Sequence, residues 1–277
     1  MNPLLNRLSH NMFPVPLRDG WVVLRALTGR DELLVQEVNL LNTLLLLDQL
    51  LCDHPHARVQ SGQASHLSVS DRDTVLLTLY ARTYGEQIQS TLRCHRCRSL
   101  FDLSFHLPSL ASRIRSETSD RELITDTGLT VRLPTGEDEL AVLALPPEVA
   151  LNTLLKRCAQ STSRSPQTFT QHDIEEIDTL LKSVAPLISG NLTAVCPECR
   201  HEQEFHFDMQ TYLLTYMKSQ QQRVFSEIHT LALTYHCGLD EILALPRLQR
   251  HQLIRLIEAY ASRSSRRAAG THHRGIL

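Results

Sequence analysis

The spacing of apolar residues changes along the chain, and the changes predict where helices give way to strands. Residues 71–84 and 173–184 carry apolar side chains at helical spacing, and a hydroxyl residue with an acid three positions later precedes each run. This arrangement is typical of a capped helix start. After each run the spacing shortens toward two, in residues 87–105 and 190–207, which indicates β-hairpins. The pattern therefore predicts a helix followed by a hairpin, twice.

Short sequence signatures also recur in the same order in the two parts of the chain. The pairs are LTGRDELL (27–34) with PTGEDELA (134–141), NTLL (42–45) with NTLL (152–155), and Ser68-x-x-Asp71 with Thr170-x-x-Asp173. Chance recurrence of several signatures in one order is improbable. We therefore interpret the chain as an internal duplication whose halves each contain two helical segments and a hairpin.

The resulting fold class is α+β and predominantly helical, with internally duplicated helix–helix–β-hairpin halves and a C-terminal helical hairpin. The predicted divisions are an N-terminal extension (1–20), a first half (21–114), a second half (128–208), a helical region (209–262) and a disordered basic tail (263–277). The C-terminal hairpin has no counterpart after the first half. It either docks to a partner or covers the core, and both interpretations remain open.

Four of the seven cysteines form two CxxC pairs, Cys94 with Cys97 and Cys196 with Cys199, each at the expected tip of a hairpin. A redox pair usually lies where a strand meets a helix start, whereas hairpin tips are typical of zinc knuckles. Four thiolates can hold one Zn²⁺ tetrahedrally and leave no open position for substrate. We predict a zinc-ribbon-like site with one structural zinc ion bound by all four cysteines. Reduced thiols without a metal are the alternative.

One departure from the usual knuckle pattern is visible in the sequence. The glycine that commonly follows each CxxC pair is replaced by Arg98 and by Arg200. With Arg93 and Arg96, these residues surround the predicted site with positive charge, which would offset the net negative charge of a zinc ion bound by four thiolates.

Composition and motifs exclude several classes of function. The chain is 42% hydrophobic and 21% charged with a net charge of −2, values typical of a globular protein without a strong preference for nucleic acid or anionic membrane. No apolar stretch approaches the roughly 20 residues of a membrane span, and the N-terminus does not resemble a signal peptide. Phosphate-loop, dinucleotide, zinc-protease and serine-hydrolase motifs are absent. We therefore predict no catalytic residues, no small-molecule substrate and a non-enzymatic protein in a reducing cytoplasm.

Four segments resemble a known family, the baseplate hub assembly proteins of contractile phage tails of the T-even type and their relatives in contractile injection systems. The segments are LRALTGRDE (24–32), the block from LSVSDRDTV to FDLSF (67–105), VRLPTGEDE (131–139) and IHTLALTYHCGLDEILALP (228–246). The resemblance implies a baseplate component or assembly chaperone that binds other baseplate or tail proteins in the bacterial cytoplasm, and is then either released or retained in the particle. The alternative is a zinc-ribbon protein that binds nucleic acid or has a regulatory role.

Overall fold

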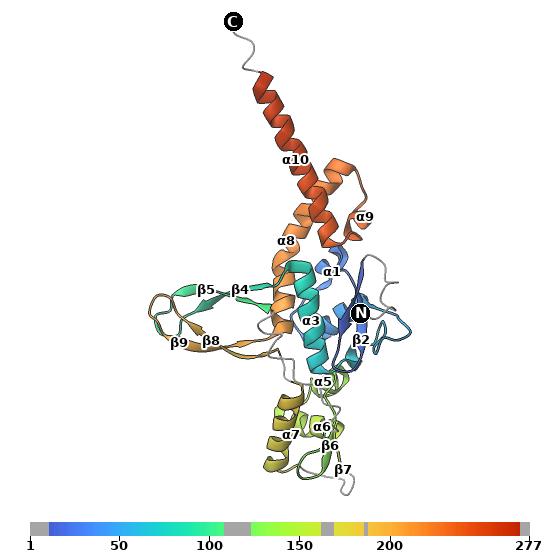
Figure 1. Cartoon of the computed structure of the whole chain (residues 1–277), viewed down its shortest axis with the longest axis vertical. Coiled ribbons are helices and arrows are strands. Elements are labelled where there is room, and N and C mark those ends of the chain that lie inside the picture. The colour runs from blue at the N-terminus through green and yellow to red at the C-terminus, as the bar shows by residue number, and fades with distance from the viewer. Residues whose placement is uncertain (1–10, 108–122, 162–168, 186–187, 272–277) are drawn as a thin grey trace.

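The computed structural model describes residues 11–107, 123–161, 169–185 and 188–271. It is an α+β protein, about half helical, with small antiparallel sheets. Two lobes lie at the centre and at one end of the molecule, an arm of four strands projects sideways, and a C-terminal helical hairpin extends beyond the opposite end (Figure 1).

The first lobe packs a three-stranded sheet against helices. Its elements are β1 (Met12–Pro16), β2 (Trp21–Arg25), α1 (Gly29–Leu34), α2 (Leu40–Leu50), β3 (Leu51–Cys52), a 3₁₀ turn η2 (Ala64–His66) and α3 (Val69–Tyr84). Leu47 and Leu50 of α2, together with Leu76 and Leu79 of α3, are fully buried in one core with the sheet. Their spacing of three residues places each pair on one helix face, as the sequence predicted.

The predicted N-terminal extension is in part a strand of this lobe. β1 pairs antiparallel with β2, and Phe13 and Val15 are buried at alternate positions. Two prolines within MFPVP argue against a strand in the sequence. They are tolerated because β1 is the edge strand of the sheet, where Pro14 and Pro16 need not donate a ladder hydrogen bond.

From β2 onward, the second lobe has the same order of strands and α-helices as the first lobe, on a smaller scale. They are β6 (Leu129–Val131), α5 (Gly136–Val142), α6 (Pro147–Cys158), β7 (Ala159–Ser161) and α7 (Gln171–Val184). This lobe has a core of its own, in which Leu129, Val131, Leu155, Phe169 and Ile177 are buried. Its two strands pair antiparallel, as β2 and β3 do in the first lobe.

The arm consists of two hairpins, β4 (Gln87–Arg93) with β5 (Leu100–His106) and β8 (Gly190–Val195) with β9 (Glu202–Phe207). Both were predicted from the sequence and both are confirmed. Figure 1 shows the two hairpins running side by side away from the lobes. At their base Phe105 and Phe207 pack edge to face with ring centroids 5.3 Å apart, which joins the hairpins there.

The C-terminal hairpin consists of α8 (Met209–Tyr235), α9 (Leu239–Leu243) and α10 (Arg247–Thr271). The first turns of α8 pack on the first lobe, where Leu213 and Met217 are fully buried. α10 continues to Thr271, so the structure places helix in a stretch that composition assigned to a disordered tail. Among the described residues, no helix combines the length and apolarity needed to cross a membrane.

The start of α10 is fastened to the chain that precedes α1. The backbone N–H of Gly29 donates to the carbonyl of Leu245 at 3.3 Å, and the N–H of Arg247 donates to the carbonyl of Leu27 at 3.3 Å. We call this pair of hydrogen bonds the helix-start contact. It holds the C-terminal hairpin against the first lobe.

Buried ion pairs reinforce this contact. The carboxylate of Glu32 is fully buried and accepts from Arg247 at 2.7 Å and from the fully buried Arg250. Arg250 also donates to Glu227 of α8 at 3.0 Å, and Glu227 lies 2.8 Å from His251. Because each buried charge has a partner of opposite sign, removing one would leave another uncompensated. The base of the hairpin therefore covers the core, in line with one of the two interpretations left open by the sequence.

The start of α3 makes the same helix-start contact with the second lobe. The hydrogen bonds run from the N–H of Gly136 to the carbonyl of Leu67 (3.1 Å) and from the N–H of Val69 to the carbonyl of Pro134 (3.1 Å). Arg72 pairs with Glu139 through both of its terminal nitrogens. The contact therefore joins the two lobes through the first turn of α3.

Candidate metal centre

The tips of the two hairpins have the same backbone geometry. In the first, the N–H of Cys94 donates to the carbonyl of Ser99 at 2.9 Å, and in the second the N–H of Cys196 donates to that of His201 at 2.9 Å. In each turn the residue after the CxxC pair also donates its backbone N–H to the carbonyl of the first cysteine. Arg98 donates to Cys94 at 3.1 Å, and Arg200 donates to Cys196 at 3.0 Å. The CxxC sequence thus folds locally into one turn, which presents both sulfurs on one side.

The residue after each CxxC pair adopts the left-handed conformation. Arg98 has a φ of 65° and Arg200 a φ of 58°. The turn requires this conformation, which explains why glycine is common there, since glycine lacks the Cβ that clashes. The two arginines therefore occupy strained backbone positions without changing the fold of the turn.

The two turns meet and bring all four sulfur atoms together. The distance from Cys94 Sγ to Cys199 Sγ is 3.6 Å, and that from Cys97 Sγ to Cys196 Sγ is 3.7 Å. All four sulfurs lie within 4.8 Å of one another. These distances exceed a disulfide bond of about 2.05 Å. The two cross-hairpin distances are close to the sulfur–sulfur distance of about 3.8 Å in a tetrahedron with metal–sulfur bonds of about 2.3 Å.

An apolar shell surrounds the inner side of the sulfur cluster. Cys94 and Cys196 are fully buried beside Phe101, Ala194 and Phe205 of the strands. Cys97 is exposed and Cys199 is half-buried, so the other side of the cluster faces solvent. The cluster is therefore held rigidly from within and accessible to an ion from outside.

A glutamine that the sequence did not single out links the two tips. The side-chain oxygen of Gln203 accepts from the N–H of His95 at 2.9 Å, and its amide nitrogen donates to the carbonyl of Arg93 at 3.2 Å. Gln203 belongs to β9, so it ties the second hairpin to the backbone on either side of Cys94. In the structure Gln203 is buried between exposed strand positions, but in the sequence it is an ordinary polar residue of a strand, so no signal marked it.

The thiol of Cys97 at the exposed edge of the cluster favours metal binding, whereas, against the hydrogen bond from the backbone N–H of His201, burial and the neighbouring thiols raise the pKa of Cys199 to about 11. Hydrogen bonds from the side chain and the backbone N–H of Ser99 lower the pKa of Cys97 to about 6, because both donors stabilise the thiolate. The thiolate is the form that binds a metal. Four thiolates would repel one another without a cation, so the cluster is suited to a divalent ion with a preference for sulfur, such as zinc.

The structure brings together all four cysteines that the sequence identified. Within the described part of the chain, they form the one group of Cys, His, Asp and Glu side chains close enough to hold a metal ion. The arrangement can bind an ion but offers no open coordination position, because four protein ligands fill a tetrahedral site.

The fold and the site together define a two-lobed α+β protein whose four-thiol cluster lies at the tip of a paired hairpin arm. Among known families, the one described as T4 bacteriophage base plate protein matches residues 14–214, which include both lobes, both CxxC pairs and the start of α8. The chain belongs to this family. No curated protein and no solved structure matches the chain.

Proposed function

We propose that this protein is a non-enzymatic baseplate component or assembly chaperone of a contractile phage tail or contractile injection system, and that one zinc ion staples its two hairpins. Membership of the base plate family supports the baseplate role. The observation that carries the staple is the convergence of four sulfurs, two from each hairpin, within 4.8 Å of one another, with the two cross-hairpin distances of 3.6 Å and 3.7 Å close to those of a tetrahedral zinc site.

The zinc ion would be bound by Cys94, Cys97, Cys196 and Cys199 and would have a structural role. Neither hairpin supplies enough ligands to close the site alone. Metal binding is therefore coupled to the docking of one hairpin on the other, and the energy of binding becomes energy of folding. The partners of the assembled protein are other baseplate or tail proteins.

We also propose that the two lobes arose by duplication. In the first lobe, Arg25 pairs with Asp31 at 2.6 Å, and the N–H of Thr28 donates to the same carboxylate at 2.8 Å. In the second, the matching distances are 2.5 Å from Arg132 to Asp138 and 2.9 Å from Thr135 to Asp138. Together with the matching order of elements and the two helix-start contacts, this agreement in detail supports a common origin.

The staple is tested by removing one ligand from each hairpin. The double variant Cys97→Ser/Cys199→Ser should lose one equivalent of zinc, measured by inductively coupled plasma mass spectrometry on protein purified with zinc and reductant. Its free energy of unfolding should fall by about 3 kcal/mol or more, because the metal stabilises only the folded state. Cys52→Ser/Cys237→Ser, which removes two cysteines outside the cluster, is the matched control and should keep its zinc. Wild-type protein without zinc would contradict the staple.

The assembly role is tested by co-purification. Wild-type protein produced in its native host should retain defined baseplate or tail proteins, and the Cys97→Ser/Cys199→Ser variant should retain less of them. A chaperone would be missing from mature particles, whereas a permanent component would be found in them by mass spectrometry.

A second function is favoured by the exposed arginines around the cluster, Arg93, Arg96, Arg98 and Arg200. In a zinc-ribbon protein that binds nucleic acid, they would contact phosphates. Affinity for DNA or RNA would then fall steeply with salt. Weak binding without a steep salt slope is expected if the net charge of −2 dominates.

A further inference from the structure

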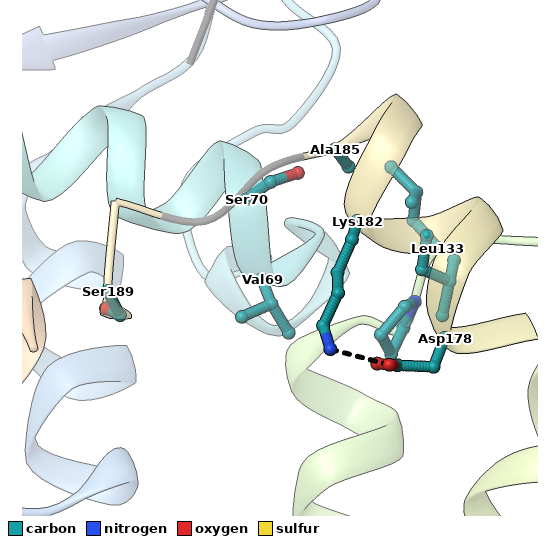
Figure 2. Close-up of a pocket in the computed structure, with 9 residues that line it drawn as sticks. Val69, Ser70, Leu133, Asp178, Lys182, Ala185 and Ser189 are labelled. Atoms are coloured by element: carbon teal, nitrogen blue, oxygen red, sulfur yellow. Dashed lines mark hydrogen bonds and ion pairs between the residues drawn. The ribbon is translucent and has the colours of Figure 1, made fainter. Parts of the chain in front are cut away.

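A cavity of about 460 Å³ opens where the two lobes meet, between α7 and the first turn of α3. Its walls are mainly apolar and are formed by Val69, Leu133, Pro134, Leu181 and Ala185. Figure 2 shows Val69 of α3 on one side of this space and the α7 residues on the other, with Lys182 and Asp178 paired at its edge. Apolar walls form no hydrogen bonds with water, so an exposed apolar surface of this kind often marks a site where another protein segment binds.

The surroundings of the cavity in the second lobe can be compared with the matching region of the first lobe, because each lobe binds the start of a helix through the same contact. The start of α10 lies on the first lobe as the start of α3 lies on the second, with backbone hydrogen bonds at matching positions. The ion pair between Arg250 and Glu32 also matches that between Arg72 and Glu139. The two lobes can therefore be compared residue by residue around these contacts.

In the first lobe α8 packs against α3, at a residue that matches one lining the cavity. Met217 of α8 is buried in one core cluster with Leu27 and Leu79. Tyr216 of α8 packs edge to face against Tyr80 with ring centroids 5.5 Å apart. The matching residues of the second lobe line the cavity: Pro134 matches Leu27, Leu181 matches Leu79 and Lys182 matches Tyr80.

We propose that this cavity is a helix seat, and that it binds an amphipathic helix of a neighbouring baseplate subunit as the first lobe binds α8. The proposal rests on the duplication and the baseplate role proposed above. A helix fits better than a small polar ligand because the walls are apolar and open along α7.

The charge near the seat defines the partner helix further. Glu175 and Asp178 are exposed on α7, with Lys182 as the basic residue paired at the rim. A helix with an apolar stripe and basic residues beside it would complement this surface. Residues 209–224 of α8 have this composition, since they include Lys218 and Arg223 but no acidic residue.

The seat can be tested with residues 209–224 as a fluorescein-labelled synthetic peptide added to the full chain. Fluorescence anisotropy should show saturable binding, and a scrambled peptide of the same composition should not bind. Leu181→Glu places a charge in the seat and should weaken binding at least about tenfold. Thr179→Glu adds the same charge at an exposed position of α7 outside the cavity lining and should leave the affinity unchanged.

A second variant covers the case in which Leu181→Glu unfolds the second lobe. Val69 lies at the first position of α3, where an acidic side chain is favourable to the helix. Val69→Glu should therefore keep the fold, checked by circular dichroism, and should also weaken peptide binding at least about tenfold. The zinc content of the protein and the baseplate proteins that co-purify with the wild-type chain are measured separately, so failure of the seat can be distinguished from failure of the proposed function.

Three results would overturn the proposal. The first is no saturable peptide binding up to about 1 mM, or binding that Val69→Glu leaves unchanged. The second is binding that occurs only after residues 108–122 are replaced by a Gly-Ser linker, which would assign the seat to that segment. The third is a self-association in sedimentation that Val69→Glu abolishes, which would assign the seat to a second copy.

Discussion

The two lobes share their local design but differ in how completely they are covered. Glu32 of the first lobe is fully buried and is held by two arginines, whereas the side chain of Glu139 in the second is 29% exposed and is held by Arg72 alone. Leu44 and Leu47 of α2 are 5% and 0% exposed, whereas the positions of α6 that match them by the NTLL repeat, Leu154 and Arg157, are half-buried and exposed. The same capping and docking contacts therefore operate in two environments of different burial.

The local contacts position each helix, while the packing around them determines how much each contact contributes to the free energy of unfolding. The β1–β2 sheet and α8 cover the first lobe, so an ion pair there is shielded from water. The equivalent pair of the second lobe is shielded less, because Glu139 is partly open to water although Arg72 is buried. We expect the first lobe to be the stable centre of the molecule and the second lobe to depend more on its neighbours.

Replacing the two matching glutamates should give the largest contrast. Glu32→Gln removes the charge that compensates Arg247 and the fully buried Arg250, and should lower the free energy of unfolding by about 3–5 kcal/mol. Glu139→Gln should cost less, about 1–2 kcal/mol, because Glu139 is partly open to water although its partner Arg72 is buried. Urea denaturation of the two variants measures the difference. Equal losses would show that the lobes are covered to the same extent.

The dependence of the free energy of unfolding on pH should distinguish the buried Asp73 of α3 from the matching exposed position of α7. Burial is the main cause that raises the pKa of Asp73 to about 6, and the nearby carboxylate of Asp208 raises it further against the opposing charge of Arg72. A carboxyl group with a raised pKa in the folded state opposes folding once it ionises. Its cost therefore grows as the pH rises from about 4 to above 6.

Asp73→Asn should accordingly stabilise the protein by about 1–2 kcal/mol at pH 8 and have little effect near pH 4. The asparagine side-chain oxygen can still accept the hydrogen bond that the hydroxyl of Ser189 donates at 3.2 Å. Glu175, which occupies the matching position of α7, is exposed, and Glu175→Gln is the control with no expected change. Urea titrations at both pH values test this, and destabilisation of Asp73→Asn at pH 8 would contradict it.

The smallest effect is expected at the hairpin tips, where the two halves are most alike. Arg98→Gly and Arg200→Gly relieve the left-handed backbone of both turns, and each should raise thermal stability by up to about 1 kcal/mol in the zinc-loaded protein. The two gains should be equal, because the φ angles differ by little. Differential scanning calorimetry measures both, and a loss in one turn alone would show that its arginine makes a contact that the other does not.

Much of the local structure could be predicted from the sequence. The capped starts at Ser68 and Thr170 are present, as are the helices that follow them and the two hairpins with CxxC at their tips. The meeting of the two CxxC pairs was also predicted, because four cysteines in two such pairs are the usual ligands of one zinc ion. The caps, helices and turns depend on residues a few positions apart, so their pattern is visible along the chain, whereas the meeting of the distant cysteines followed from the number of ligands that one ion needs.

Other features depended on contacts between distant parts of the chain. The strand β1 carries two prolines and is stable only because it lies at a sheet edge beside β2. Gln203 and the buried pair of Glu32 with Arg250 join residues far apart in sequence. Their residue types are ordinary for exposed positions, so no local pattern marks them as buried.

The sequence by itself therefore determined the capped helices, the two hairpins and the set of cysteines, because these follow from propensity and short-range spacing, whereas the small sheets of the two lobes were not predicted. The tertiary structure decided which lobe α8 covers, where a cavity is left between α7 and α3, and which charges are buried. The physical reason is that burial depends on how whole elements pack together, and two segments with the same local signature acquire different neighbours in the folded chain.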